Sequence, residues 1–133
     1  MRLLLTFPYL NLYLHEGSAP VLELQWLSYV SSANFRAAAT QALAFTRNYH
    51  VKAWLGDDRL LGAVRPRDLE WAEQDILPAL AQAGVERFAR LESQDALNNR
   101  LISSMYARAE ASVPFPIRHF ADLPAARAWA SGS

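Results

Sequence analysis

The segment VKAWL, residues 51–55, restricts the possible folds of this chain more than any other segment, because it is apolar at nearly every position. A strand with one face in water alternates apolar and polar residues, whereas a strand covered on both faces is a continuous apolar run. We therefore expect residues 51–55 to form a central strand. Because a sheet with helices on both faces covers such a strand, the segment predicts an α/β fold.

The flanking segments predict the rest of the architecture. YLNLYLHEG, residues 9–17, and VLELQWL, residues 21–27, alternate with a period of two around turn residues, which predicts an antiparallel hairpin. Residues 2–7 either extend the first strand or form a short strand of their own. Further strands are predicted at 85–91 and 115–120, and helices at 34–49, 66–83, 94–111 and 122–130. The order β-β-α-β-α-β-α-β-α predicts a single α/β domain over residues 1–133, with a mixed four- to five-stranded sheet and about four helices.

Periodicity also predicts which side of each helix is buried. In the helix over residues 94–111, Leu97, Leu101 and Met105 fall on one face, which Arg108 extends. We expect this face to pack against the sheet, because apolar residues at such spacing form the buried side of a helix. Pro78 lies inside the helix that begins at Pro66, where it removes a backbone donor, so we expect a kink there.

Composition excludes several classes of protein. The 13 basic and 13 acidic residues cancel, so no basic surface for nucleic acid is indicated. The chain has no cysteine, which excludes disulfide scaffolds and Cys-ligated metals. The apolar run after Arg2 is shorter than a signal-peptide core of roughly 7–15 residues. No stretch approaches the ~20 apolar residues of a membrane span. We expect a cytoplasmic protein with no nucleic-acid partner.

Charged residues gather directly after the central strand. Asp57, Asp58 and Arg59 follow the apolar run, and Arg65 and Arg67 flank the start of the next helix. Ligands of open α/β sheets bind at the carboxyl ends of the strands, where these residues are expected to lie on a solvent-facing rim. Three interpretations stay open. Asp57 closes the turn by pairing with Arg59 or Arg65, the cluster binds a partner or ligand, or the carboxylates serve in catalysis.

The tryptophans offer a second candidate site. Trp54 on the central strand, Trp71 on the following helix and Phe35 on the preceding one are placed to line an apolar pocket between sheet and helices. Such a pocket would suit a small apolar or lipid-like ligand. Ordinary core packing, with each indole N–H hydrogen-bonded, is the alternative role.

No motif for catalysis, metal binding or cofactor binding is present. The histidines at 15, 50 and 119 match no metal-ligand spacing, and the five glycines form no phosphate-binding loop. No Gly-x-Ser-x-Gly motif supports a hydrolase. We therefore expect no enzyme, no metal site and no cofactor.

Several segments, in this order, resemble a family. WLSYVSSANFR is similar to a Trp-x-Gly-x-x-Ser…Phe-Arg stretch of small bacterial proteins with the SpoIIAA-like fold, often labelled STAS-domain proteins, although Ser28 replaces the Gly. AWLGDDRLLG resembles their Trp-Leu-x-Asp-x-Arg-x-Leu pattern. DLEWAEQDILPALAQAG and IRHFADLPAARAWA match later parts, so the resemblance covers about residues 9–130.

The resemblance implies a SpoIIAA-like fold and a non-enzymatic, regulatory role in binding another protein. STAS domains of the anti-sigma-factor antagonist type are switched by phosphorylation of a Ser or Thr just after the central strand. Here no Ser or Thr lies between Thr46 and Ser93, so we expect that switch to be absent. We expect a protein-binding module that acts through the loop after the central strand. A carrier of a small apolar ligand is the alternative, and a homodimer formed through a sheet edge is a further one.

Overall fold

The computed structural model describes residues 1–132 and contains one six-stranded mixed sheet with strand order β1-β2-β3-β4-β5-β6. Strands β1, β2 and β3 pair in antiparallel fashion, and β3, β4, β5 and β6 pair in parallel fashion. The strands span β1 Arg2–Phe7, β2 Leu10–His15, β3 Val21–Trp26, β4 Ala53–Asp57, β5 Arg87–Leu91 and β6 Ile117–Phe120. The helices span α1 Ser32–Asn48, α2 Pro66–Trp71, η1 Ala72–Ile76, α3 Leu77–Gln82, α4 Ala96–Glu110 and α5 Leu123–Ala130.

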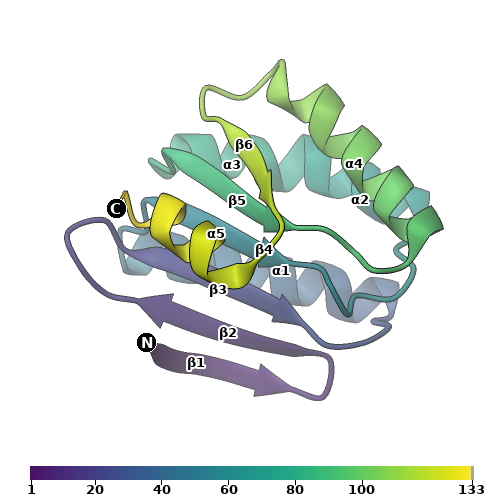
Figure 1. Ribbon diagram of the computed structural model, residues 1–133, viewed down its shortest axis with the longest axis horizontal. Coiled ribbons are helices and arrows are strands. Elements are labelled where there is room, and N and C mark those ends of the chain that lie inside the picture. Colours follow the sequence, from purple (N-terminus) through teal and green to yellow (C-terminus); the bar gives the residue numbers. More distant parts are fainter. Residues whose placement is uncertain (133) are drawn as a thin grey trace.

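The prediction of an α/β fold with a mixed sheet is confirmed, but the sheet has six strands and not four or five. Residues 2–7 form their own strand, β1, which pairs with β2 at the edge of the sheet (Figure 1). Pro8 lies in the turn between the two strands, outside either of them. The missing N–H of the proline therefore interrupts no ladder, and the segment is free to fold back on itself.

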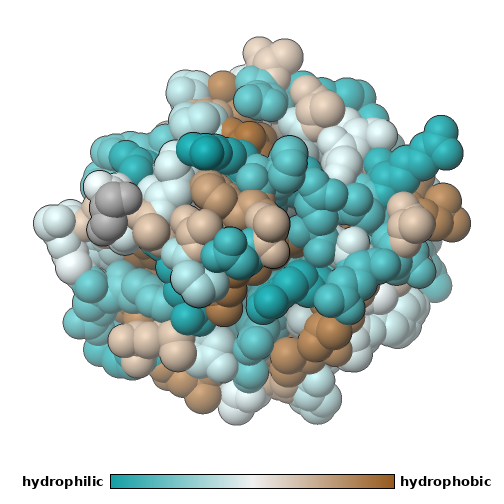
Figure 2. Space-filling model, viewed as in Figure 1, coloured by the Kyte–Doolittle hydropathy of each residue, from teal (hydrophilic) through white to brown (hydrophobic). Residues whose placement is uncertain are grey.

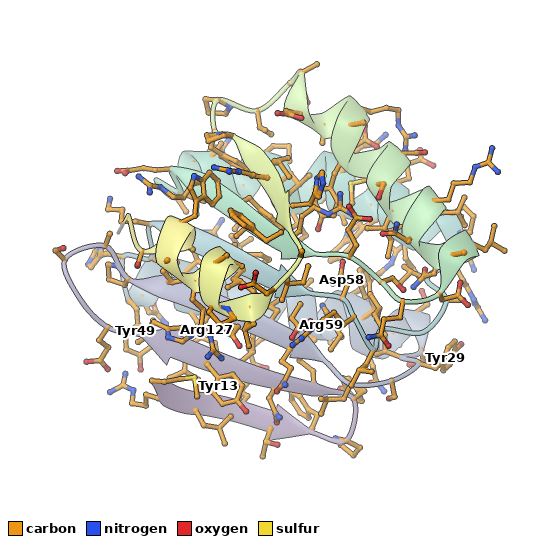
Figure 3. The ribbon with its side chains drawn as sticks, viewed as in Figure 1. Tyr13, Tyr29, Tyr49, Asp58, Arg59 and Arg127 are labelled. Atoms are coloured by element: carbon orange, nitrogen blue, oxygen red, sulfur yellow. The ribbon has the colours of Figure 1, made fainter. Side chains whose placement is uncertain are left out.

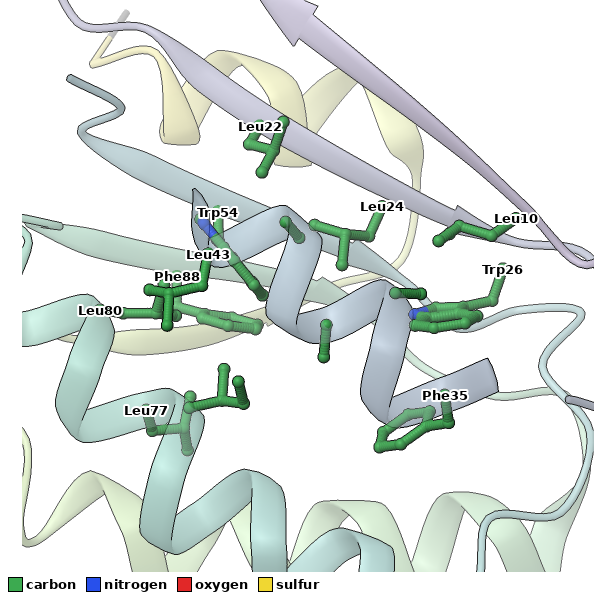
Figure 4. Packing of buried hydrophobic residues seen from close by; sticks show 14 of the residues in the cluster. Leu10, Leu22, Leu24, Trp26, Phe35, Leu43, Trp54, Leu77, Leu80 and Phe88 are labelled. Atoms are coloured by element: carbon green, nitrogen blue, oxygen red, sulfur yellow. The ribbon is translucent and has the colours of Figure 1, made fainter. Parts of the chain in front are cut away.

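Helices cover both faces of the sheet. The packing of α1, α3 and α4 buries the larger apolar cluster on one face, and α5 lies across β3, β4 and β5 on the other (Figure 1). Figure 4 shows α1 and the chain around Leu77 and Leu80 turned toward the apolar side of the strands. Trp54 on β4 faces the larger cluster, while its neighbours Ala53 and Leu55 face α5. The central strand is thus buried on both sides, as its continuous apolar sequence predicts.

A buried charge cluster holds α5 against the sheet. The Arg127 guanidinium of α5 donates to both carboxylate oxygens of Glu23 on β3, at 2.8 and 3.0 Å, and His15 lies 2.8 Å from the same carboxylate. Burial alone would raise the pKa of Glu23, but the hydrogen bonds from His15 and Arg127 outweigh it and keep that pKa low. Glu23 is therefore a paired carboxylate with a structural role.

The helix that begins at Pro66 changes its geometry before Pro78. Residues Ala72–Ile76 form a π-helical turn, in which the Leu77 N–H bonds to the Ala72 carbonyl, and α3 follows with Pro78 in its first turn. Pro78 has no N–H to donate, and the π turn directly before it is where the regular hydrogen bonding of this continuous helix is interrupted. A π-helical turn therefore lies just before Pro78, where a kink was expected.

The predicted buried face of the helix over residues 94–111 is wrong by one position. Leu97 and Leu101 are exposed, with 68% and 38% of their surface accessible, while Asn98, Ile102 and Met105 are buried. The helix is rotated because Asn98 turns inward to bond the backbone that follows β4. A hydrophobicity pattern cannot anticipate this, since it places the asparagine outside.

Candidate functional site

The site lies where β4 ends. Successive side chains of this strand point to opposite faces of the sheet, so neighbouring residues of the site lie on different sides. Trp54 and Gly56 face the larger apolar cluster, whereas Ala53 and Leu55 face α5. Asp58 continues the first series and lines a cavity on that side. Asp57 continues the second series, so two adjacent aspartates enter different surroundings. Figure 3 shows Asp58 and Arg59 at this end of the central strands.

Asp57 forms a closed pair with Arg59. Its carboxylate accepts hydrogen bonds from Arg59 Nε and Nη2, both at 2.9 Å, and from the Arg59 backbone N–H at 3.3 Å. The hydrogen bonds to Asp57 raise the pKa of the Arg59 guanidinium. Arg65, the other predicted partner, makes no ion pair with it. A two-point pair of this kind fixes the direction of the turn, which agrees with the turn-closing interpretation of Asp57.

Asp58 is placed in the opposite way. The residue is 5% exposed, and its carboxyl has no hydrogen-bond partner among residues 1–132; only its backbone groups are bonded, to Leu91 and Leu61. Burial raises the pKa of Asp58 to about 7, the charge of Asp57 raises it further, and the positive charge of Arg90 opposes the shift. A buried carboxyl without a donor is favoured in its protonated form.

The cavity that Asp58 lines has a volume of about 60 Å³. Its walls are almost entirely apolar and come from the sheet, α1, the helix after Pro66 and α4; they include Trp54, Phe35, Leu61, Val64 and Met105. Trp71, which was expected to line a pocket with Trp54 and Phe35, is not part of the wall. It packs edge-on against Phe35 at 6.3 Å and under the Arg36 guanidinium at 5.2 Å.

The size of the cavity bears on the ligand-carrier alternative. Ligand pockets commonly hold about 300–1,000 Å³. A cavity of about 60 Å³ is far below this range and does not favour a lipid-like ligand. The indole N–H of Trp54 donates to Thr46 Oγ1 at 2.7 Å, as expected for a tryptophan that packs in a core.

Two side chains beside Asp58 were not identified from the sequence. Arg90 on β5 is 5% exposed, lies over the Tyr106 ring at 4.9 Å, donates from Nη2 to Ser103 at 2.9 Å, and leaves its Nε without a partner. Tyr106 on α4 lines the cavity, and burial together with the nearby Asp58 charge raises its pKa. Register brings these groups together, because Arg90 pairs with Gly56 across the parallel strands.

Asn98 holds the segment that follows Asp58. Its Nδ2 donates to the carbonyls of Leu61 and Gly62 at 3.1 and 2.9 Å, and its Oδ1 accepts from the Val64 N–H at 3.2 Å. Gly62 donates to the Ser28 carbonyl, and a Cβ at position 62 would lie 2.7 Å from Tyr29 Cα. The irregular segment of residues 58–65 is therefore held by a few specific contacts.

Exposed side chains surround this segment. Leu60 is 56% exposed, Tyr29 is 58% exposed beside Gly62, and Leu97 begins α4 next to Gln94, whose N–H bonds to the Arg59 carbonyl. Arg65 and Arg67 are exposed at the start of α2 and form no ion pair within residues 1–132. We call this region the carboxyl-edge surface, defined by Tyr29, Arg59, Leu60, Arg65, Arg67 and Leu97. Figure 2 shows a mixed hydrophilic and hydrophobic surface, with a hydrophobic group protruding near the start of α4.

The expectation that Asp57 and Asp58 face solvent on this rim is wrong. Both are buried, with 3% and 5% of their surface accessible, although they lie at the expected end of β4. The strand runs two residues further than predicted, so Asp57 belongs to it and Asp58 turns inward. Arg59, with 38% of its side chain accessible, together with Arg65 and Arg67, reaches the surface as expected.

Residues 1–132 contain no group of three or more His, Asp or Glu side chains arranged to hold a metal ion. No helix in this range has the length and apolarity needed to cross a membrane.

Comparison with known proteins identifies the fold. No protein-family model and no curated protein matches the sequence. An uncharacterised DUF3478-family protein with a SpoIIAA-like fold from Shewanella loihica PV-4 superposes with a TM-score of 0.65 and 12% identity, over 94% of this chain and 96% of that one. An anti-sigma factor antagonist from Mycobacterium paratuberculosis superposes with a TM-score of 0.54 and 14% identity, over 95% and 98% of the two chains. The SpoIIAA-like fold expected from the sequence is confirmed.

Proposed function

We propose that this SpoIIAA-like α/β domain is a regulatory binding module that contacts another protein through its carboxyl-edge surface. One observation carries the proposal: three large apolar side chains, Tyr29, Leu60 and Leu97, are exposed on the irregular segment at the carboxyl ends of the parallel strands or on stretches of chain that contact it. Exposed large apolar groups beside charged ones are typical of protein-binding surfaces.

The charges of the carboxyl-edge surface indicate which kind of partner surface would complement it. Arg65 and Arg67 are exposed without an ion pair in residues 1–132, and Arg59 keeps part of its guanidinium accessible beside them. A partner that presents apolar side chains ringed by carboxylates would complement this arrangement. The likeness to an anti-sigma factor antagonist, a protein named for its effect on another protein, supports the same class of function.

Catalysis is less well supported by the geometry. The pKa of Asp58, about 7, would suit a general acid or base. The cavity that Asp58 lines is about 60 Å³, and Tyr106 is the other polar side chain in its wall. Without room for a substrate and without a nucleophile beside it, Asp58 lacks the arrangement that reaction chemistry requires.

Site-specific photocrosslinking in the cells that produce the protein tests the proposal. A benzophenone amino acid replaces Leu60 or Leu97, and the matched control replaces Ser18, which is exposed in the turn at the opposite end of the sheet. We expect one crosslinked protein at positions 60 and 97 that is absent at position 18. Equal crosslinking at all three positions, or none, contradicts the proposal, and a product of twice the subunit mass identifies a homodimer instead.

Substitutions then measure the contribution of each group once the partner is purified. Leu60→Asp places a charge in the apolar centre and is expected to weaken binding at least tenfold, while Arg65→Glu reverses a rim charge and is expected mainly to slow association. The control Ser18→Asp, at the opposite end, is expected to leave the Kd unchanged. Calorimetry and surface binding kinetics provide the two readouts.

A further inference from the structure

We propose that Asp58 is a proton-operated latch for residues 58–65: its protonated carboxyl keeps the segment closed over the cavity, and its ionisation releases the segment and uncovers Leu61 and Val64. Only the effect of the latch on partner binding rests on the proposed function. Such an effect is expected because the released segment carries Leu60 and borders Tyr29 on the carboxyl-edge surface. The opening itself is a property of the isolated chain.

The apolar surroundings of Asp58 explain why its ionisation favours opening of residues 58–65. An ionised carboxylate in an apolar cavity is costly unless donors or a paired charge replace water. Asp58 has neither: no hydrogen bond reaches its carboxyl, and no ion pair within 4 Å joins it to a cation of the described chain. A proton on the carboxyl removes this cost while the segment is closed, and contact with water removes it when the segment opens.

The charged and titratable groups around Asp58 come from three elements. Asp57 of β4 opposes its ionisation, Arg90 of β5 favours it, and Tyr106 of α4 faces it as a neutral phenol with a raised pKa. The walls contributed by β3, α1 and the helix after Pro66 are apolar. Burial contributes most to the raised pKa of Asp58, Arg90 opposes the shift and Asp57 adds to it, and the result is a pKa of about 7.

The segment is irregular and is held in place by a small number of contacts. Residues 58–65 contain no helix or strand, and they are bounded by β4 and by α2. The side chain of Asn98, the Gly62–Ser28 backbone bond and the burial of Leu61 and Val64 hold them closed. Because only a few hydrogen bonds hold the segment, ionisation of one buried carboxyl is comparable in free energy with the whole closure.

Amide hydrogen exchange tests the latch on the complete chain without any partner. Exchange of residues 58–65 is measured from pH 6 to 8.5 and corrected for the intrinsic pH dependence of amide exchange. In the wild type we expect protection of this segment to fall about tenfold or more across the titration of Asp58, while protection of α5 stays constant. The carboxyl ¹³C shift of Asp58 reports its titration in the same samples.

Three variants show whether the pH dependence of exchange comes from Asp58 or from another carboxylate. Asp58→Asn is expected to keep the segment protected at every pH. Asp75→Asn, at an exposed position of η1, is the matched control and is expected to behave as the wild type. Asp57→Asn removes a charge that opposes the ionisation of Asp58, so the transition is expected at a lower pH.

Opposite results overturn the latch. If the hydrogen-exchange protection of residues 58–65 in the wild type does not change with pH, the latch is excluded. This outcome is expected if the ionised Asp58 carboxylate pairs with the unpartnered Nε of Arg90 and the segment stays closed. A pH-dependent loss that persists in Asp58→Asn also excludes it. If Asp58→Asn does not fold, the wild-type ¹³C titration decides, because opening must follow the midpoint of Asp58. Failure of the latch leaves partner crosslinking unaffected, so the two proposals are tested separately.

Discussion

Asp57 and Asp58 are adjacent in the chain, yet one is a fully paired carboxylate and the other has no hydrogen-bond partner for its carboxyl within residues 1–132. Asp57 accepts two side-chain hydrogen bonds from Arg59 at 2.9 Å, whereas Asp58 lines an apolar cavity of about 60 Å³. The two neighbouring carboxyl groups thus lie in different surroundings, one hydrogen-bonded and one apolar, because β4 ends between two differently packed faces of the sheet.

This difference predicts how stability depends on pH. The pKa of Asp58 is about 7 in the folded chain, above its ordinary value of 3.8, so the folded state binds this proton more tightly. Its contribution is therefore fully present below pH 3.8 and is lost as pH rises through about 7. We expect the free energy of unfolding of the wild type, relative to Asp58→Asn, to fall by up to about 4 kcal/mol between acid and alkaline pH.

Urea unfolding at pH 5, 6, 7 and 8 measures this difference. Glu23 is hydrogen-bonded to His15 and Arg127, and Asp68 to Ser32 and Arg36, and these bonds lower the pKa values of both carboxylates. Their contributions to stability are therefore lost only as pH falls further into the acid range, below the window in which Asp58 titrates. Parallel pH profiles for wild type and Asp58→Asn would show that Asp58 titrates as an ordinary carboxyl.

Two single substitutions at adjacent residues of α4, one polar to apolar and one apolar to polar, test which face of the helix is buried. Asn98→Leu leaves the Leu61 and Gly62 carbonyls and the Val64 N–H without their partner, and we expect a loss of about 2–4 kcal/mol in the free energy of unfolding. Leu97→Asn, at a position 68% exposed, is the control and is expected to change it by at most about 0.5 kcal/mol. Equal losses in thermal or urea unfolding would place Leu97 in the core.

Close packing of two loops makes Gly62 sensitive to substitution. In Gly62→Ala the new Cβ would lie 2.7 Å from the Cα of Tyr29, so backbone must shift, and we expect a loss of about 1–3 kcal/mol. Gly56→Ala is the control, because its nearest contact, a Phe88 ring carbon at 3.6 Å, is an ordinary one. Differential scanning fluorimetry compares the two, and a Tm for Gly62→Ala at or above that of Gly56→Ala would contradict the close approach.

The hydroxyl of Thr46 has a role that an exposed threonine of the same helix lacks. Thr46 Oγ1 donates to the Ala42 carbonyl and accepts from the Trp54 indole, whereas exposed Thr40 only donates to the Arg36 carbonyl. Thr46→Val leaves a buried indole N–H unsatisfied, and we expect a loss of about 1–3 kcal/mol in the free energy of unfolding. Thr40→Val is expected to change little. The outcome that counts against this role is an equal effect of both variants in urea unfolding.

Much of the architecture was predictable because it follows from local pattern. The strict alternation at Leu10, Leu12 and Leu14 specifies one face of β2, and the continuous apolar run at 51–55 specifies a strand buried on both faces. The helix predicted at 122–130 is also present as α5, and Asp122 caps it by accepting the Ala125 N–H at 2.8 Å. The position of the charged residues at the carboxyl end of β4 was predictable for the same reason.

The parts that failed depend on contacts between distant segments. Asn98 lies inside because loop carbonyls 36 and 37 residues away need its amide, and this inverts the face expected from Leu97 and Leu101. Arg90 and Tyr106 meet Asp58 through strand register and helix packing, which no spacing in the sequence reveals.

The sequence by itself therefore determined the α/β order, the central strand and the end of the sheet at which the charged residues gather, because hydrophobic periodicity is a local property of the chain. The tertiary structure alone decided that Asp57 is paired and Asp58 is enclosed in an apolar cavity. Burial and hydrogen bonding are set by what other segments bring to a side chain. These two factors determine whether a buried acidic residue is paired with an arginine, as Asp57 is, or has its pKa raised toward neutral pH, as Asp58 has.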